Sequence, residues 1–152
     1  MREKNSVWGR PCWTQEEDRE HELEVARKIE ECWGVTVGSF GPFSTVDYWI
    51  QREGRICGVA ELKCQLRDGL AYATLDVKRW LSLQMWATAT DLKAIFVCRK
   101  LSGDAYWVDV FDIATNGTMR MGGPKGSPVP VVWVPFEEMR IIKERTIDDQ
   151  RV

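Results

Sequence analysis

Residues 45–63 read TVDYWIQREGRICGVAELK, and this stretch decides the fold. Apolar and aromatic residues fill two runs, residues 46–51 and residues 55–63. Between the runs stands Arg52-Glu53-Gly54, which offers the glycine that a tight turn favours. The pattern predicts two antiparallel strands joined by a hairpin.

The hairpin predicts that two acidic residues meet. Asp47 heads the first strand and Glu61 ends the second. Counting outward from the turn places them roughly opposite each other, where cross-strand side chains are neighbours. Glu61 and Lys63 point to one face because strand side chains alternate, and the carbonyl of Leu62 lies between them. Oxygen ligands of this kind suit Mg²⁺, which takes few carboxylates and keeps several waters. We therefore expect a divalent-metal site at this end of the hairpin.

The rest of the chain predicts a mixed α/β order. The expected elements are a helix from the Thr14–Glu17 capping box to Gly34, a strand at 35–37, a loop at 38–42, the hairpin, a helix capped by Thr74 and ending at 90–91, strands at 94–99 and 105–111, a turn at 116–117, a mobile loop at 121–130, a strand at 131–134 and a short element at 136–142. Residues 1–13 are expected to be a lead-in and residues 143–152 a frayed tail. The length of 152 residues favours one domain with its own core.

Composition restricts the class of protein. The formal net charge of -2 argues against a general positive field for nucleic acid, so any basic surface must be local. Five cysteines without a CxxC pair and a single histidine disfavour a zinc site and favour free thiols in a reducing compartment. The start of the chain lacks the apolar segment of a signal peptide, and no window approaches the roughly 20 apolar residues of a membrane helix. We expect a cytoplasmic protein without a membrane segment.

The order of helix, strand with an acid, strand with Glu-x-Lys, helix and strand resembles the core of the PD-(D/E)xK nuclease superfamily across residues 14–111. The resemblance implies a restriction-endonuclease-like α/β fold, with a mixed central sheet of about five strands flanked by helices. It also implies a DNA endonuclease that depends on Mg²⁺ or Mn²⁺. By this likeness Asp47, Glu61 and the Leu62 carbonyl would hold the metal, and Lys63 would position or activate the attacking water.

Further residues extend the resemblance. Glu22 would match the additional acid that many members carry on the first helix, because it shares a face with Ala26 and Ile29. Two neighbouring acids, Glu20 and Glu24, remain open for that place. Gln65 and Lys78 are further candidates for contact with the substrate. The chain departs from the family pattern in one place, since a valine and not a proline precedes Asp47.

Other interpretations of the same residues remain open. The pattern acid-x-Lys also occurs at residues 76–78 and 91–93, where it fits surface charge, and Glu22 also fits a solvated helix face. The eight tryptophans fit packing better than base stacking, because most of them recur at core spacings. Within the superfamily, the small size also fits a Holliday-junction resolvase, which would act as a dimer. An RNA substrate stays open, and a noncatalytic nucleic-acid-binding or assembly module is the alternative from another class.

Overall fold

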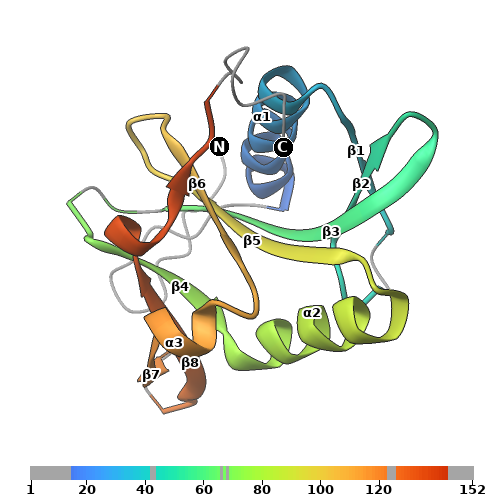
Figure 1. Ribbon diagram of the computed structural model, residues 1–152. Helices are drawn as coiled ribbons and strands as arrows, with labels where there is room; N and C mark the ends of the chain where they lie inside the picture. Colours follow the sequence, from blue (N-terminus) through green and yellow to red (C-terminus); the bar gives the residue numbers. More distant parts are fainter. Residues whose placement is uncertain (1–14, 42–43, 66, 68, 123–125, 144–152) are drawn as a thin grey trace.

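The computed structural model describes residues 15–41, 44–65, 67, 69–122 and 126–143, and the side chains from residue 19 onward. The elements are α1 (Gln15–Trp33), β1 (Thr36–Ser39), β2 (Tyr48–Arg52), β3 (Arg55–Cys64), β4 (Tyr72–Asp76), α2 (Val77–Thr90), β5 (Lys93–Arg99), β6 (Ala105–Asp109), α3 (Ile113–Asn116), β7 (Thr118–Gly122), β8 (Val129–Pro135), the 3₁₀ helix η2 (Phe136–Glu138) and β9 (Arg140–Ile141). Figure 1 shows α1 and α2 on opposite sides of the strands β3 and β5. No helix in these ranges is long and apolar enough to cross a bilayer.

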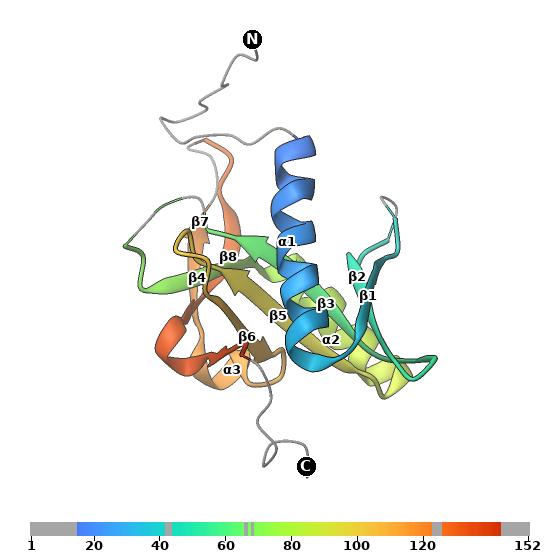
Figure 2. The same ribbon diagram turned by 90° about the horizontal axis from the view of Figure 1, so that it is seen from above.

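The main sheet has six strands in the order β1-β2-β3-β5-β6-β9. Only the β3–β5 pair is parallel among its ladders, and β4 and α2 make the connection between these two strands. Figure 2 shows the sheet from above, with α1 lying across it. The predicted mixed α/β fold is confirmed, with one strand more than expected in the main sheet.

A second sheet has three strands in the order β4-β8-β7. The strand expected at 131–134 is confirmed as part of β8, whereas β4 and β7 were missed by the sequence analysis. Residues 72–76 alternate between buried and half-buried positions, which is the period of a strand and not of a helix. Thr74 therefore lies inside β4, and its assignment as the helix cap was wrong. The cap is Asp76, whose carboxylate accepts a hydrogen bond from the Lys78 N–H at 2.8 Å.

The region expected as a mobile loop, residues 121–130, also lies partly in this second sheet. Its two ends belong to β7 and β8, which pair with each other. Pro130 is tolerated there because β4 pairs with β8 only from Val131 onward, so the missing N–H interrupts no bond to β4. The middle of this loop, the Thr14 cap, the lead-in at 1–13 and the tail after Lys143 fall outside the described residues.

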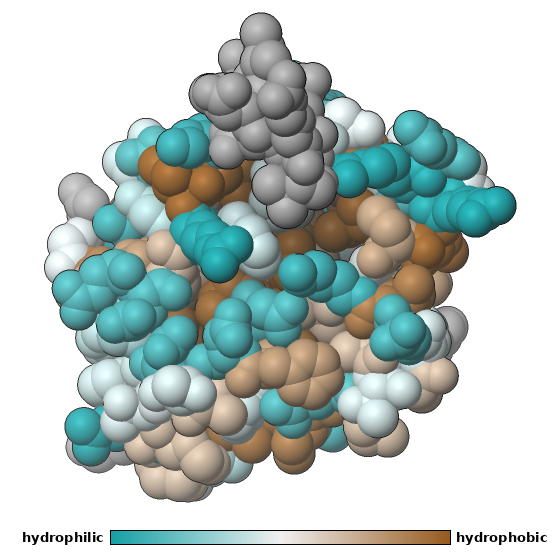
Figure 3. All heavy atoms as spheres, in the orientation of Figure 1, coloured by the Kyte–Doolittle hydropathy of each residue, from teal (hydrophilic) through white to brown (hydrophobic). Residues whose placement is uncertain are grey.

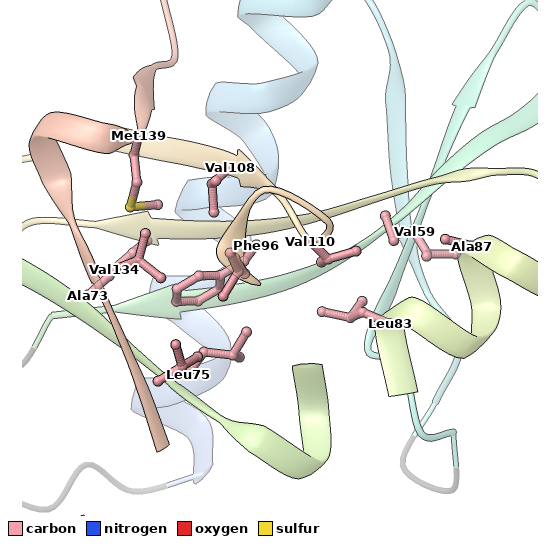
Figure 4. Packing of buried hydrophobic residues seen from close by; sticks show 14 of the residues in the cluster. Val59, Ala73, Leu75, Leu83, Ala87, Phe96, Val108, Val110, Val134 and Met139 are labelled. Atoms are coloured by element: carbon pink, nitrogen blue, oxygen red, sulfur yellow. The ribbon is translucent and has the colours of Figure 1, made fainter. Parts of the chain in front are cut away.

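Two apolar clusters, one on each side of the main sheet, form the core. The first packs α1 against the sheet and includes Val25, Ile29 and Leu62. The second lies between the opposite face, α2 and the second sheet, and Phe96 stands within it, fully buried. Figure 4 shows Phe96 beside Leu75, with side chains from several strands around its ring. The second sheet therefore closes the core on the α2 side.

The β2–β3 turn is formed by Glu53 and Gly54, as expected for this hairpin. Both residues have positive φ angles, 51° and 78°, as the central residues of a type I′ turn do. Glycine adopts this conformation freely, whereas glutamate is strained in it. The turn therefore retains some backbone strain at its first central residue.

Replacing the strained residue should stabilise the protein. Glu53→Asn creates the Asn-Gly dipeptide that type I′ turns prefer, so we expect the free energy of unfolding to rise by about 0.5–1 kcal/mol. Glu53→Ala serves as the matched control, because it removes the same charge and keeps a side chain that disfavours positive φ. Urea unfolding of the three proteins measures the difference, and equal stability of the Asn and Ala variants would contradict the strain argument.

Candidate functional site

A β-bulge determines which side chains face each other across the hairpin. Gln51 pairs with Ile56, whereas Ile50 pairs with Gly58, so Cys57 is the extra residue on β3. Beyond the bulge the pairing continues to Tyr48 and Ala60. One step further, this register brings Asp47 opposite Glu61.

The bulge is necessary for this meeting. Without the extra residue Asp47 would face Ala60, and Glu61 would point to the opposite side of the sheet. The backbone of Asp47 is held in line because its carbonyl accepts a hydrogen bond from the Phe40 N–H at 3.1 Å, next to the β1–β2 ladder. The two acids therefore share one face of the sheet, the face covered by α2.

Glu61 is the buried member of this acid pair. Its residue is 5% exposed, and its Oε2 atom is shielded from solvent without a hydrogen-bond partner. Burial, followed by a hydrogen bond and charge repulsion from Asp47, raises the pKa of Glu61 to about 8, although Arg79 and Lys63 lower it. At neutral pH this raised pKa favours the protonated form of Glu61.

Arg79 of α2 is the cation in contact with the pair. Its Nη1 lies 3.2 Å from Asp47 Oδ1 and donates a further hydrogen bond to the Thr45 carbonyl at 3.2 Å. Arg79 shares a helical row with the buried Leu83 and so faces the sheet. Lys78, the helix residue named from the sequence, is exposed to solvent.

The remaining residues of the β3 motif lie beyond the paired part of β2. Leu62 pairs with Val97 of β5, while the described β2–β3 pairing stops at Tyr48. Lys63 is half-buried and acts electrostatically on Glu61. Gln65 is buried, and its side chain donates to the Leu70 carbonyl at 3.4 Å across the turn after β3.

Glu22 approaches from α1, on the other side of the sheet from Arg79. The Tyr48 hydroxyl donates a hydrogen bond to its carboxylate, and burial followed by this bond raises the pKa of Tyr48. The two alternative candidates on this helix point elsewhere: Glu24 pairs with Arg99 at 3.1 Å, and Glu20 is exposed. Glu22 therefore contacts Tyr48, the residue that follows Asp47, on the α1 side of the sheet.

The donors at the acid pair fit Mg²⁺ better than a metal that needs many side-chain ligands. Within the described ranges, no group of three or more His, Cys, Asp and Glu residues is placed to hold a metal. Mg²⁺ needs only one or two carboxylates, since water and substrate oxygens complete its shell. Asp47 and Glu61 supply two carboxylates, and the unpaired Oε2 of Glu61 offers a buried acceptor. A divalent cation here would replace the proton on Glu61 and relieve the repulsion.

The sequence analysis missed two residues of this site. Arg79 carried a usable signal, because its spacing of four from Leu83 and eight from Ala87 puts it on the buried row of α2. Tyr48 follows Asp47 and points to the opposite face, so its hydrogen bond to Glu22 depends on how α1 packs on the sheet. Strand alternation alone does not reveal such a bond.

Comparison with known proteins gives a family and a fold. A family model described as "Phage putative PDDEXK endonuclease" matches residues 8–140. No curated protein matches the chain. Among solved structures, the 1.6 Å structure of Hjc, a Holliday junction resolvase from the archaeal hyperthermophile Archaeoglobus fulgidus, is similar with a TM-score of 0.53 and 12% sequence identity. The match covers 78% of this chain and 86% of that chain, and at this identity it shows a shared fold.

The buried acid pair should make stability depend on pH. Since burial and Asp47 raise the pKa of Glu61 from its ordinary value of 4.5 to about 8, its contribution to stability is fully present below pH 4.5 and is lost as the pH rises through 8. In chelator, we expect the free energy of unfolding to fall between pH 5 and pH 8.5 by a few kcal/mol, on the order of one per unit of pKa difference.

Glu61→Gln should remove most of this fall, because the amide can donate to Asp47 at every pH. Glu20→Gln is the control, since Glu20 is exposed on α1, and it should keep the wild-type profile. Urea unfolding at both pH values measures the effect. A profile for Glu61→Gln that parallels the wild type would show that Glu61 does not carry the proton.

Proposed function

Because the chain belongs to the phage PDDEXK endonuclease family, we propose that it hydrolyses phosphodiester bonds of DNA with Mg²⁺ or Mn²⁺ as cofactor. The observation that carries the proposal is the pair of Asp47 and Glu61, with a buried unpaired oxygen on Glu61 and Lys63 on the same face. The arrangement supplies negative charge for a divalent ion and a cation beside it. Nuclease chemistry needs both.

Three groups would hold the ion: the carboxylates of Asp47 and Glu61 and the main-chain carbonyl of Leu62. A divalent ion bound there supplies charge neutralisation for the phosphate and lowers the pKa of a bound water. Lys63 follows Glu61 by two residues and points to the same side of β3, so it is placed to orient the attacking water and to stabilise negative charge as it develops. Glu22 is held by Tyr48 on the α1 side of the sheet, so as the additional acid it would act from behind the acid pair and not as a ligand of the ion.

Residues of α2 would contact the phosphate backbone. Arg79 touches Asp47 while its side chain is 42% exposed, so it can turn to a phosphate oxygen that lies next to the acid pair. Lys78 precedes it in the same helical turn and is open to solvent, where a more distant phosphate would pass. Gln65 would support the substrate side by holding the turn that follows β3.

A Holliday-junction resolvase acting as a homodimer is the second candidate. It is favoured by the fold shared with the archaeal resolvase and by the exposed face of α2, where Leu81 and Met85 are 50% and 71% exposed and lie one turn apart. A symmetric pair of cuts needs two active sites, and this apolar face is available for a second copy.

A substrate panel tests the proposal. Linear duplex, single strand, supercoiled plasmid, four-way junction and RNA are incubated with wild type and with Asp47→Ala, in Mg²⁺, Mn²⁺ or chelator. We expect metal-dependent cleavage of DNA by wild type alone, and weaker Mn²⁺ binding by Asp47→Ala in calorimetry. Preference for the four-way junction, with a dimer in solution, would favour the resolvase. Folded protein that cuts nothing and binds no Mn²⁺ would favour the noncatalytic module.

Lys63 should act on the rate and not on affinity. We expect Lys63→Ala to lower the cleavage rate at saturating DNA by roughly 10²- to 10³-fold, because a preorganised charge next to the reacting phosphate is lost. Folding and DNA binding should stay close to wild type. Lys78→Ala is the contrasting variant, expected to weaken binding with little change in the saturated rate. Wild-type cleavage by Lys63→Ala would overturn the role given to this lysine.

A further inference from the structure

A cavity of about 690 Å³ lies on the α1 side of the main sheet, away from the acid pair. Its floor comes from the strands and includes Ile50 and Ile95, which belong to the apolar cluster under α1. Its volume is in the range of cavities that bind small organic ligands, about 300–1,000 Å³. The cavity is therefore large enough for one or two nucleotides.

Two tryptophans form an aromatic wall of this cavity. Trp33 ends α1 and Trp107 lies on β6, with ring centroids 5.6 Å apart and an interplanar angle of 85°. Both side chains line the cavity and are only half-buried. An aromatic wall next to apolar strands suits a flat, apolar ligand surface such as a nucleobase.

The rim of the cavity is basic. Of the described residues that line it, four are cationic and none is acidic: Arg52, Lys93, Arg140 and Lys143. Lys93 also pairs with Asp109 of β6 at 3.8 Å, outside this lining. Two of the four cations already lie over the Trp107 ring, Arg140 at 5.3 Å and Lys93 at 6.0 Å from its centroid. In a chain with a net charge of -2, this is a local concentration of positive charge. Figure 3 shows the face seen in Figure 1, where hydrophobic surface at the centre is bordered by hydrophilic side chains.

The cavity is separate from the candidate nuclease site. Its lining on β3 ends at Val59, two residues or about 7 Å along the strand before Glu61, so the separation comes from the face of the sheet on which each lies. The cavity opens on the α1 side, while Arg79 brings α2 to the acids on the opposite face. A ligand in the cavity would not occupy the place of the scissile phosphate.

We propose that this cavity binds one or two nucleotides of a single-stranded nucleic acid. The base would lie against Trp33 and the apolar floor, and the phosphates would pair with Arg140 and Lys93 at the rim. Aromatic side chains beside a basic groove are the features with which proteins hold single strands without regard to sequence. The choice of nucleic acid over another polyanion rests on the proposed nuclease function, and the site itself goes beyond that function.

Such a site would serve as an anchor outside the reaction centre. A substrate with a single-stranded segment could reach both the acid pair and the cavity. Once one site is occupied, the other is bound at a high effective concentration, so the affinity would exceed that for a blunt duplex. The cavity would thus select for branched, gapped or tailed substrates.

Binding is tested without cleavage, in chelator and on the Asp47→Ala background. The probe is a fluorescein-labelled oligothymidylate of about ten nucleotides, a length typical of single-strand sites, followed by anisotropy. We expect Arg140→Glu and Lys93→Glu each to weaken binding about tenfold or more and to reduce its salt dependence. Arg120→Glu is the matched control, because Arg120 lies over a different indole, Trp133 at 5.5 Å, in the second sheet. It should bind like the parent protein.

The outcomes separate this proposal from the nuclease assignment. Equal oligonucleotide affinity for Arg140→Glu and Arg120→Glu would overturn the cavity as a nucleotide site even if the protein cuts DNA. Binding of an acidic peptide, with no response to the oligonucleotide, would assign the cavity to a protein partner and overturn it as well. Oligonucleotide binding that depends on Arg140, together with a negative cleavage panel, would keep the cavity and remove the nuclease.

Discussion

The extra residue at Cys57 is the constraint on which the site depends. An antiparallel hairpin carries its side chains in fixed opposition, so one inserted residue exchanges the faces of everything beyond it. Here the exchange carries Glu61 from the α1 side to the side of α2, where Asp47 already points. The Glu-x-Lys motif therefore depends on the backbone irregularity that precedes it as much as on its own residues.

Once the register brings the acids together, the rest of the molecule sets their charge. The sheet and the second apolar cluster exclude water from Glu61, and α2 places Arg79 beside Asp47. Two carboxyl groups in such a place tend to keep a proton unless a cation replaces it, which is why the pKa of Glu61 stands at about 8. The electrostatic cost of this pair is what the divalent ion of the proposed function would relieve.

Much of the central fold was predictable from the sequence, because its signals are local. The hairpin from Tyr48 to Cys64, the end of α1 at Gly34 and the buried strand β5 all follow from periodicity and turn residues. The second sheet was not predictable in this way. β7 has no clear strand pattern in the sequence and is defined by its pairing with β8, and the helix cap at Asp76 depends on where β4 ends. In the site, the spacing of Asp47 and Glu61 from the hairpin turn predicted the acid pair. The contacts of Arg79 and Tyr48 could not be predicted in this way, because they depend on how α2 and α1 pack on the sheet.

The parallel pairing of β3 with β5 has a consequence for how the protein folds. The hairpin closes over a two-residue turn, but β5 joins β3 only after β4 and α2 have been arranged, which is a long and slow closure. In that order of events, the two acids would be neighbours in the hairpin before Arg79 arrives with α2. Early folding species would carry an unscreened pair of carboxylates, whose repulsion would slow the formation of the hairpin. Mild acid or divalent ions should therefore speed this step.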